Sequence, residues 1–139
     1  MKHYLLVIFI IIGCKKSEII YDAPKEDIST LIELSLNSFA DLRSGHHLKF
    51  GKHNKYFISF YKLENPLKRR IKFFGKLLND KINDIRNEDN LIEIYFYKKI
   101  SPTKFQIRYM ISNKNIDVIT FIEYINGKWI ATNCDIGYI

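Results

Sequence analysis

The chain of 139 residues has few cysteines and lacks the motifs of the common enzyme classes. Its two cysteines, Cys14 and Cys134, form no CxxC pair, and no HExxH, glycine-rich phosphate loop or Gly-x-Ser-x-Gly occurs. These absences argue against the common hydrolases and nucleotide-binding enzymes. Repeats, low-complexity tracts and a second linker are also missing, so the length predicts one domain, over residues 23–139.

The sequence also lacks an apolar run long enough to cross a bilayer, which takes about 20 residues. Its longest apolar block, residues 4–12, has nine residues and follows Lys2 and His3. This order of charge and apolar length is typical of the central region of a secretory signal, which has roughly 7–15 residues. Residues 4–12 therefore predict export of the chain.

The block ends in Ile11-Ile12-Gly13-Cys14, which resembles the lipobox of bacterial lipoproteins. The resemblance implies a signal peptide over residues 1–13, cleavage between Gly13 and Cys14, and fatty acylation of the Cys14 thiol, commonly with palmitate. Residues 14–22 would then be the lipidated N-terminus and a short tether. The charged stretch that follows, residues 15–18, resembles the export signal of Bacteroidetes lipoproteins. We therefore expect an outer-membrane lipoprotein that faces the periplasm or the cell surface.

If Cys14 carries lipid, Cys134 is the one remaining thiol, and no disulfide can form within the chain. We expect Cys134 to be a small buried residue on the last strand. The alternative is a redox-active or intermolecular thiol.

The composition is globular, with 47% hydrophobic and 27% charged residues. Lys and Arg number 22 against 15 Asp and Glu, which gives a net charge of +7. Such a charge favours contact with phosphates or anionic lipid and does not specify a fold. We expect no nucleic acid partner for an exported protein.

Two segments have apolar residues at helical spacing. Residues 23–42 place Pro24 in the first turn, after Asp22 as a capping residue. Asn65-Pro66 predicts the start of a second helix that runs to about residue 86, with apolar positions three and four residues apart. Between these helices, residues 56–63 alternate as a strand, and the loop before that strand holds His46, His47 and His53. The two adjacent histidines cannot easily reach one metal ion, so we expect no metal site, and no cofactor is indicated.

From residue 91 the apolar period changes to two, which predicts strands over residues 91–100, 104–112, 116–125 and 128–134. Asn126-Gly127 predicts a tight hairpin, because both central residues of a type I′ turn need positive φ. The predicted fold is therefore α+β, with two helices packed on a twisted antiparallel sheet in the order helix, strand, helix and four-stranded meander. This order resembles the NTF2-like (cystatin-like cone) superfamily, as does the ending Asn126-Gly127-Lys128-Trp129. The resemblance implies a cone-shaped pocket between sheet and helices.

Two groups of residues are candidate sites. Asp117 and Glu123 share one face of a predicted strand, and either they line the cone pocket or they meet water on the outer side of the sheet. The second group is a basic set on the polar side of the second predicted helix: Lys68, Arg69, Arg70, Lys72 and Lys76. These residues either contact lipid headgroups or other anionic envelope components, or form a solvated face of the helix. The sequence favours a small cell-envelope lipoprotein with a non-catalytic binding or interaction module. The alternatives are an immunity-type lipoprotein that neutralises a toxin, and a small NTF2-like enzyme or ligand carrier.

Overall fold

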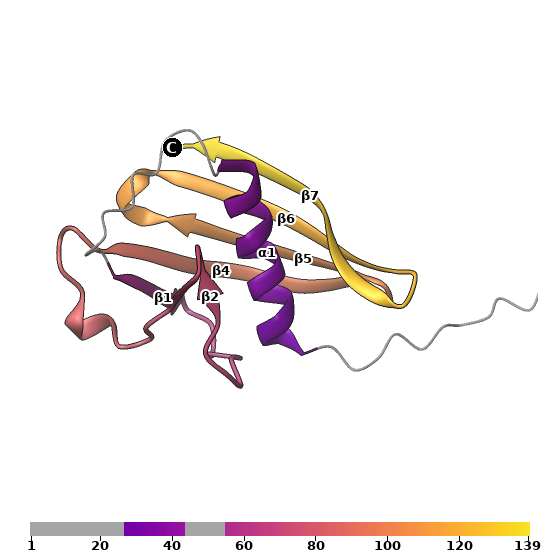
Figure 1. The fold of residues 1–139 in the computed structure, drawn as a ribbon, viewed down its shortest axis with the longest axis horizontal. Helices are drawn as coiled ribbons and strands as arrows, with labels where there is room; N and C mark the ends of the chain where they lie inside the picture. The colour runs from indigo at the N-terminus through magenta and orange to yellow at the C-terminus, as the bar shows by residue number, and fades with distance from the viewer. Residues whose placement is uncertain (1–26, 44–54) are drawn as a thin grey trace, which may run out of the picture.

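The computed structural model describes residues 27–43 and 55–139, and this part of the chain is mostly β (Figure 1). It contains one α-helix, α1 (Ile28–Arg43), and two 3₁₀ turns, η1 (Ile82–Asp84) and η2 (Ser112–Lys114). The strands are β1 (Tyr56–Phe60), β2 (Lys72–Phe73), β3 (Lys76–Leu77), β4 (Asn90–Ser101), β5 (Lys104–Ile111), β6 (Ile116–Ile125) and β7 (Lys128–Tyr138).

Five of the strands form one sheet in the order β1-β4-β5-β6-β7. Strands β4 to β7 pair with their chain neighbours as an antiparallel meander, as the two-residue period predicts. Strand β1 pairs parallel to β4, so the sheet is mixed. The prediction of a wholly antiparallel sheet is therefore wrong, and β7 extends four residues beyond the predicted end at residue 134.

The turn between β6 and β7 has the geometry that its sequence predicts. Asn126 and Gly127 both have positive φ, 51° and 80°. This is the left-handed backbone that a two-residue hairpin requires, and asparagine and glycine adopt it most readily.

Helix α1 begins where Asp27 satisfies its first donors. The Asp27 carboxylate accepts from the Ser29 N–H at 3.1 Å and from the Thr30 hydroxyl at 2.9 Å. The predicted capping residue Asp22 lies outside the described residues. One face of the helix is fully buried against the sheet, as its apolar spacing predicts: Leu31, Ile32, Leu36 and Phe39.

The second predicted helix, residues 66–86, is absent from the structure. The segment forms a loop, the small hairpin of β2 and β3, and the turn η1. Phe74 and Gly75 have φ of 49° and 74° and occupy the two central positions of that hairpin. A helix cannot continue through two left-handed residues, and Gly75 would also weaken a helix interior.

Packing explains why the hairpin replaces the helix. Five strands spaced about 4.8 Å apart make a sheet roughly 19 Å wide, whereas one helix is about 10 Å in diameter. Helix α1 contacts β6 and β7, and β2 lies beside it over the other end of the sheet (Figure 1). Phe73 of β2 is fully buried there, with its ring centroid 6.1 Å from that of Phe39 and 5.6 Å from that of Tyr56.

The predicted fold class is therefore wrong. Residues 27–43 and 55–139 form one helix, a mixed five-stranded sheet and a two-stranded sheet, instead of the two helices on an antiparallel sheet that an NTF2-like cone implies. The space under α1 is filled by a single hydrophobic cluster that includes Phe39, Ile94, Tyr109 and Ile122.

Asp89 holds together the ends of β1 and β4. Its two carboxylate oxygens accept from the N–H groups of Lys55, at 2.9 Å, and Arg86, at 3.0 Å. The residue is 4% exposed. Burial alone would raise the pKa of the Asp89 carboxyl, but these two hydrogen bonds and the positive charges of Arg86 and Lys55 together outweigh it, so the pKa lies below its ordinary value.

We predict that Asp89→Asn destabilises the protein by about 1–3 kcal/mol at neutral pH, because an amide nitrogen cannot accept from the second N–H. A lowered folded-state pKa adds stability above the unfolded pKa of about 3.9, and that contribution is lost as pH falls through the folded value. Urea unfolding at several pH values should therefore show the difference between wild type and variant shrinking in acid. The exposed acid Asp84 is the control, and Asp84→Asn should stay within about 0.5 kcal/mol. A difference that grows in acid would contradict this account.

Candidate functional site

The basic residues predicted on a helix lie instead in and after the loop that contacts the start of α1. Arg69 donates to the Glu33 carboxylate at 2.6 Å, and its Nε lies 3.8 Å from Asp27. The Lys72 N–H donates to the other Glu33 oxygen at 2.9 Å. Burial would raise the pKa of Glu33, but the hydrogen bonds from Arg69 and Lys72 lower it overall. Arg69 therefore fastens this loop to the helix.

The other members of the basic set have different surroundings. The Lys76 ammonium lies 5.3 Å from the centroid of the Tyr56 ring. The Lys68 N–H donates to the Ser29 hydroxyl at 2.9 Å, which fixes the loop beside the first turn of α1. The side chains of Lys68, Arg70 and Lys72 are exposed and form no ion pair with any residue that the structure describes. These three cations are the part of the predicted set available to an anion.

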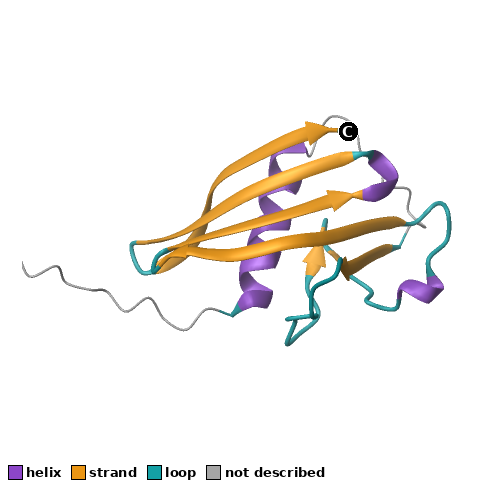
Figure 2. Ribbon diagram, turned by 180° about the vertical axis from the view of Figure 1, so that it is seen from behind, coloured by secondary structure: helices purple, strands orange, loops and turns teal. Residues whose placement is uncertain are grey.

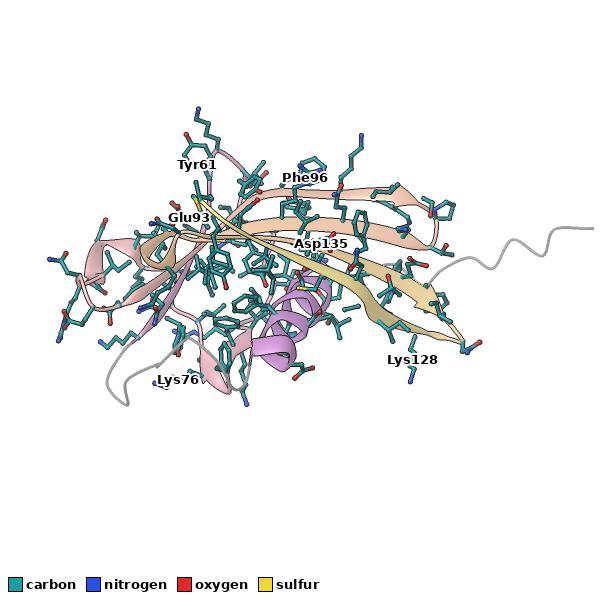
Figure 3. The ribbon with its side chains drawn as sticks, turned by 90° about the horizontal axis from the view of Figure 1, so that it is seen from above. Tyr61, Lys76, Glu93, Phe96, Lys128 and Asp135 are labelled. Atoms are coloured by element: carbon teal, nitrogen blue, oxygen red, sulfur yellow. The ribbon has the colours of Figure 1, made fainter. Side chains whose placement is uncertain are left out.

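Asp117 and Glu123 both lie on the face of the sheet opposite α1, which we call the outer face. Their strand neighbours Ile116, Val118 and Ile122 are buried beneath α1, and alternation along β6 directs the two carboxylates the other way. Figure 2 views this face with the strands in front of the helix. Figure 3 shows Phe96 and Tyr61 on the outer side of the sheet and α1 with Lys76 on the other.

At one end of the outer face, a salt bridge links β6 to β5. The Glu123 carboxylate lies 3.2 Å from the Lys104 ammonium and accepts from the Thr132 hydroxyl at 3.0 Å. Lys104, and then Thr132, lower the pKa of Glu123. The Lys104 ammonium also lies 4.9 Å from the centroid of the Phe121 ring. The charge of Glu123 is thus matched from within the sheet.

A β-bulge in β4 brings two consecutive aromatic residues to the outer face. The pairing with β5 shifts between Ile94 and Phe96, so Tyr95 and Phe96 both leave the core side. The Arg108 guanidinium lies 5.2 Å from the centroid of the Phe96 ring. Bulges commonly redirect side chains beside functional sites.

Next to the bulge, the outer face contains a hollow of about 590 Å³. Its walls are the turn after β1, which stands above the sheet, and residues of β4 and β5 (Figure 3). Lys62 has a φ of 55°, which turns the chain back over the sheet. We call this feature the outer hollow, and its lining residues are Tyr61, Lys62, Leu63, Glu93, Tyr95 and Met110.

Two carboxylates flank Met110 in one row across the sheet. Glu93 of β4 is opposite Met110 of β5, which is opposite Asp117 of β6. Glu93 accepts a hydrogen bond from the Ser112 hydroxyl, and Asp117 accepts from the Tyr95 hydroxyl at 2.6 Å. Burial and then the Asp117 carboxylate raise the pKa of Tyr95 to about 12. The hydrogen-bond donors to both carboxylates are therefore neutral hydroxyl groups.

A second hollow, of about 560 Å³, lies between α1 and β7. It is lined by residues such as Leu34, Asn37 and Ile130, and Cys134 lies at its side. Cys134 is half-buried, packs against the core and accepts from the Thr120 hydroxyl at 3.9 Å.

Several predicted features lie outside the described residues: Gly13, Cys14, His46, His47 and His53. Among residues 27–43 and 55–139, no three His, Cys, Asp or Glu side chains gather closely enough to hold a metal ion. The same part of the chain has no helix with the length and apolar character to cross a membrane.

Comparison of the chain with protein-family models, with curated proteins and with solved structures gave no match.

The outer hollow was not predicted from the sequence. Glu93 lies between Ile92 and Ile94, which are both buried. Because successive side chains of a strand point to opposite faces, the sequence does indicate that Glu93 faces outward. The bulge that adds Tyr95 to the same face, and the return of Tyr61 above the sheet, depend on pairing between strands and have no local sequence signal.

We predict that Asp117→Asn lowers the pKa of Tyr95 from about 12. The negative charge that accepts the Tyr95 proton disfavours the tyrosinate, and the amide removes that charge. Carbon-13 NMR of the hydroxyl-bearing ring carbon, recorded during a pH titration and assigned with Tyr95→Phe, measures the change.

Tyr56 is the internal control, because burial alone raises its pKa to about 12 on the other side of the sheet. An equal shift at Tyr56, or none at Tyr95, would show that Asp117 does not act on Tyr95 directly.

Proposed function

We propose that the protein is a lipid-anchored component of the bacterial cell envelope, attached to the outer membrane through Cys14, and that its domain binds a protein partner. The observation that carries the anchoring proposal is the sequence Ile11-Ile12-Gly13-Cys14 at the end of a nine-residue apolar block. Each buried CH₂ of an acyl chain contributes roughly 0.8 kcal/mol, and one chain alone binds marginally. Two or three chains on Cys14 would hold the protein firmly.

The exposed basic residues support this arrangement. The tether of residues 15–22 and the four residues before Asp27 together span at most about 42 Å when extended, so the domain stays close to the membrane. The chain leads from this tether into α1, and Lys68 and Arg70 lie in the loop beside the first turn of that helix. Each well-placed cation near an anionic surface contributes roughly 1 kcal/mol. We therefore propose that Lys68, Arg70 and Lys72 contact anionic headgroups.

The outer face supports a protein partner. It combines partly exposed aromatic side chains, among them Tyr61 and Phe96, with charged groups and a hollow. Aromatic residues and arginine are enriched in protein interfaces, where they supply large apolar contact areas. The opposite face is covered by α1 and the β2–β3 hairpin, so in the described part of the chain the outer face is the uncovered side of the sheet.

We predict that Cys14→Ala abolishes incorporation of radiolabelled palmitate in cells and leaves an uncleaved precursor. The reason is that the thiol accepts the diacylglycerol on which cleavage depends in the proteins with a matching lipobox. Cys134→Ala is the matched control, since it removes the other thiol and should retain the label and the mature size. A labelled Cys14→Ala protein would refute the lipobox.

We predict that a photo-crosslinking amino acid at Phe96 captures an envelope protein in intact cells. The same group at Leu77, which is 52% exposed on β3 at the covered side, should not. Immunoblots of the two variants, expressed at equal levels, make the comparison. Capture from Leu77 alone would place the partner on the wrong face for this proposal.

A further inference from the structure

Two carboxylates lie at the outer hollow: Glu93 lines it, and Asp117 lies beside it on the strand next to Met110. Glu93 and Asp117 are half-buried, and their hydrogen-bond donors are the neutral hydroxyls of Ser112 and Tyr95. Neither carboxylate forms an ion pair with a cation in the described residues. Because partial burial strengthens electrostatic attraction relative to water, such a pair of carboxylates favours a cation from outside.

Two cations of the protein approach this row, and each has an aromatic partner. The Lys62 ammonium lies 5.1 Å from the centroid of the Tyr61 ring, at the rim of the hollow. The Arg108 guanidinium lies over Phe96, one row further along the sheet. Lys62 is itself part of the lining of the hollow, and its ammonium, like the Arg108 guanidinium, lies against an aromatic ring of the protein.

The shape of the hollow suits a long cationic side chain. Strands are about 4.8 Å apart, so a group above Met110 lies between Glu93 and Asp117, roughly one strand spacing from each. Met110 and Leu63 offer apolar contact for an aliphatic stem, and the rings of Tyr61 and Tyr95 offer π faces for a cation. Gly137 continues the row beyond Asp117, and a Cβ there would meet nothing within 4 Å, so the row is open on that side.

We propose that the outer hollow receives an arginine side chain of the protein partner, a proposal that rests on the proposed function. The planar guanidinium stacks on aromatic rings and binds carboxylates through several donors, which matches the combination of tyrosines and acids here. Glu93 inside the hollow and Asp117 beside it, on the strand next to Met110, bind the charge. Tyr61 and Tyr95 flank the charge, and Met110 forms the floor.

Carbon-13 methyl NMR of methionine tests the site in the full-length chain. The protein has two methionines, Met1 and Met110, so Met110 is a nearly unique reporter and Met110→Leu assigns it. The probe is Nα-acetyl-arginine amide, and the matched neutral probe is the citrulline compound of the same shape. We expect a saturable shift of the Met110 signal with arginine and none with citrulline. Equal shifts with both probes would overturn the proposal.

Charge variants test the two carboxylates. Glu93→Gln and Asp117→Asn should each weaken arginine binding by at least about two- to fivefold, because the carboxylates are half-buried and exposed ion pairs already contribute that much. Glu123→Gln is the matched control, because Glu123 lies on the same face, outside the hollow and paired with Lys104. It should leave binding unchanged. Unchanged binding in the Glu93→Gln/Asp117→Asn double variant would overturn the proposal.

Cross-linking from Phe96 separates this inference from the proposed function. If the wild-type background gives no captured protein, the proposed partner binding itself fails. If capture occurs and the double variant retains it undiminished, partner binding stands and the arginine site fails. We expect capture in wild type and in Glu123→Gln, and a clear loss in the double variant.

Discussion

The fold depends on one constraint, which is that a single 16-residue helix is too narrow to cover one face of a five-stranded sheet. The uncovered end of that face would leave Tyr56 and Phe39 partly in water. The segment between β1 and β4 removes this exposure by inserting Phe73 between them. Since a large aromatic side chain buries roughly 150–250 Å², this contact outweighs the modest helix propensity of the segment. Arg69 and Glu33 then hold the loop to the helix.

This constraint explains which elements could be predicted from the sequence. Strands β4 to β7 follow from alternation and from Asn126-Gly127, because both signals act between neighbours in the chain. The segment of residues 66–86 has apolar residues at helical spacing as well, yet Ile71, Phe73 and Leu78 are the ones buried. Their partners lie on α1 and β1, far away in the sequence, and a local pattern carries no information about them. Gly75 is a local sign against a helix in this segment.

The candidate site also has features that the local sequence predicts and features that depend on contacts between distant parts of the chain. The shared face of Asp117 and Glu123 follows from parity along β6, whereas the side of the sheet they occupy depends on where α1 lies. Parity likewise separates Glu93 from the buried Ile92 and Ile94. The bulge at Tyr95 and the turn at Lys62 are products of strand pairing, and they convert a flat polar face into a hollow. The chemistry of the site was therefore visible in the sequence, and its shape was not.

The two proposed contacts use surfaces of opposite charge: cations for the membrane and carboxylates for the protein partner. On a chain with a net charge of +7, the exposed cations Lys68, Arg70 and Lys72 gather near the first half of α1, the described element that is nearest to Cys14 in the sequence. Glu93 and Asp117 lie on the other side of the sheet. An anionic membrane attracts the first group and repels the second, so anchoring would turn the carboxylates away from the lipid surface. A cationic partner would be attracted to the side that faces away from the membrane. The same field that holds the base of the domain on the lipid would thus keep the outer hollow accessible.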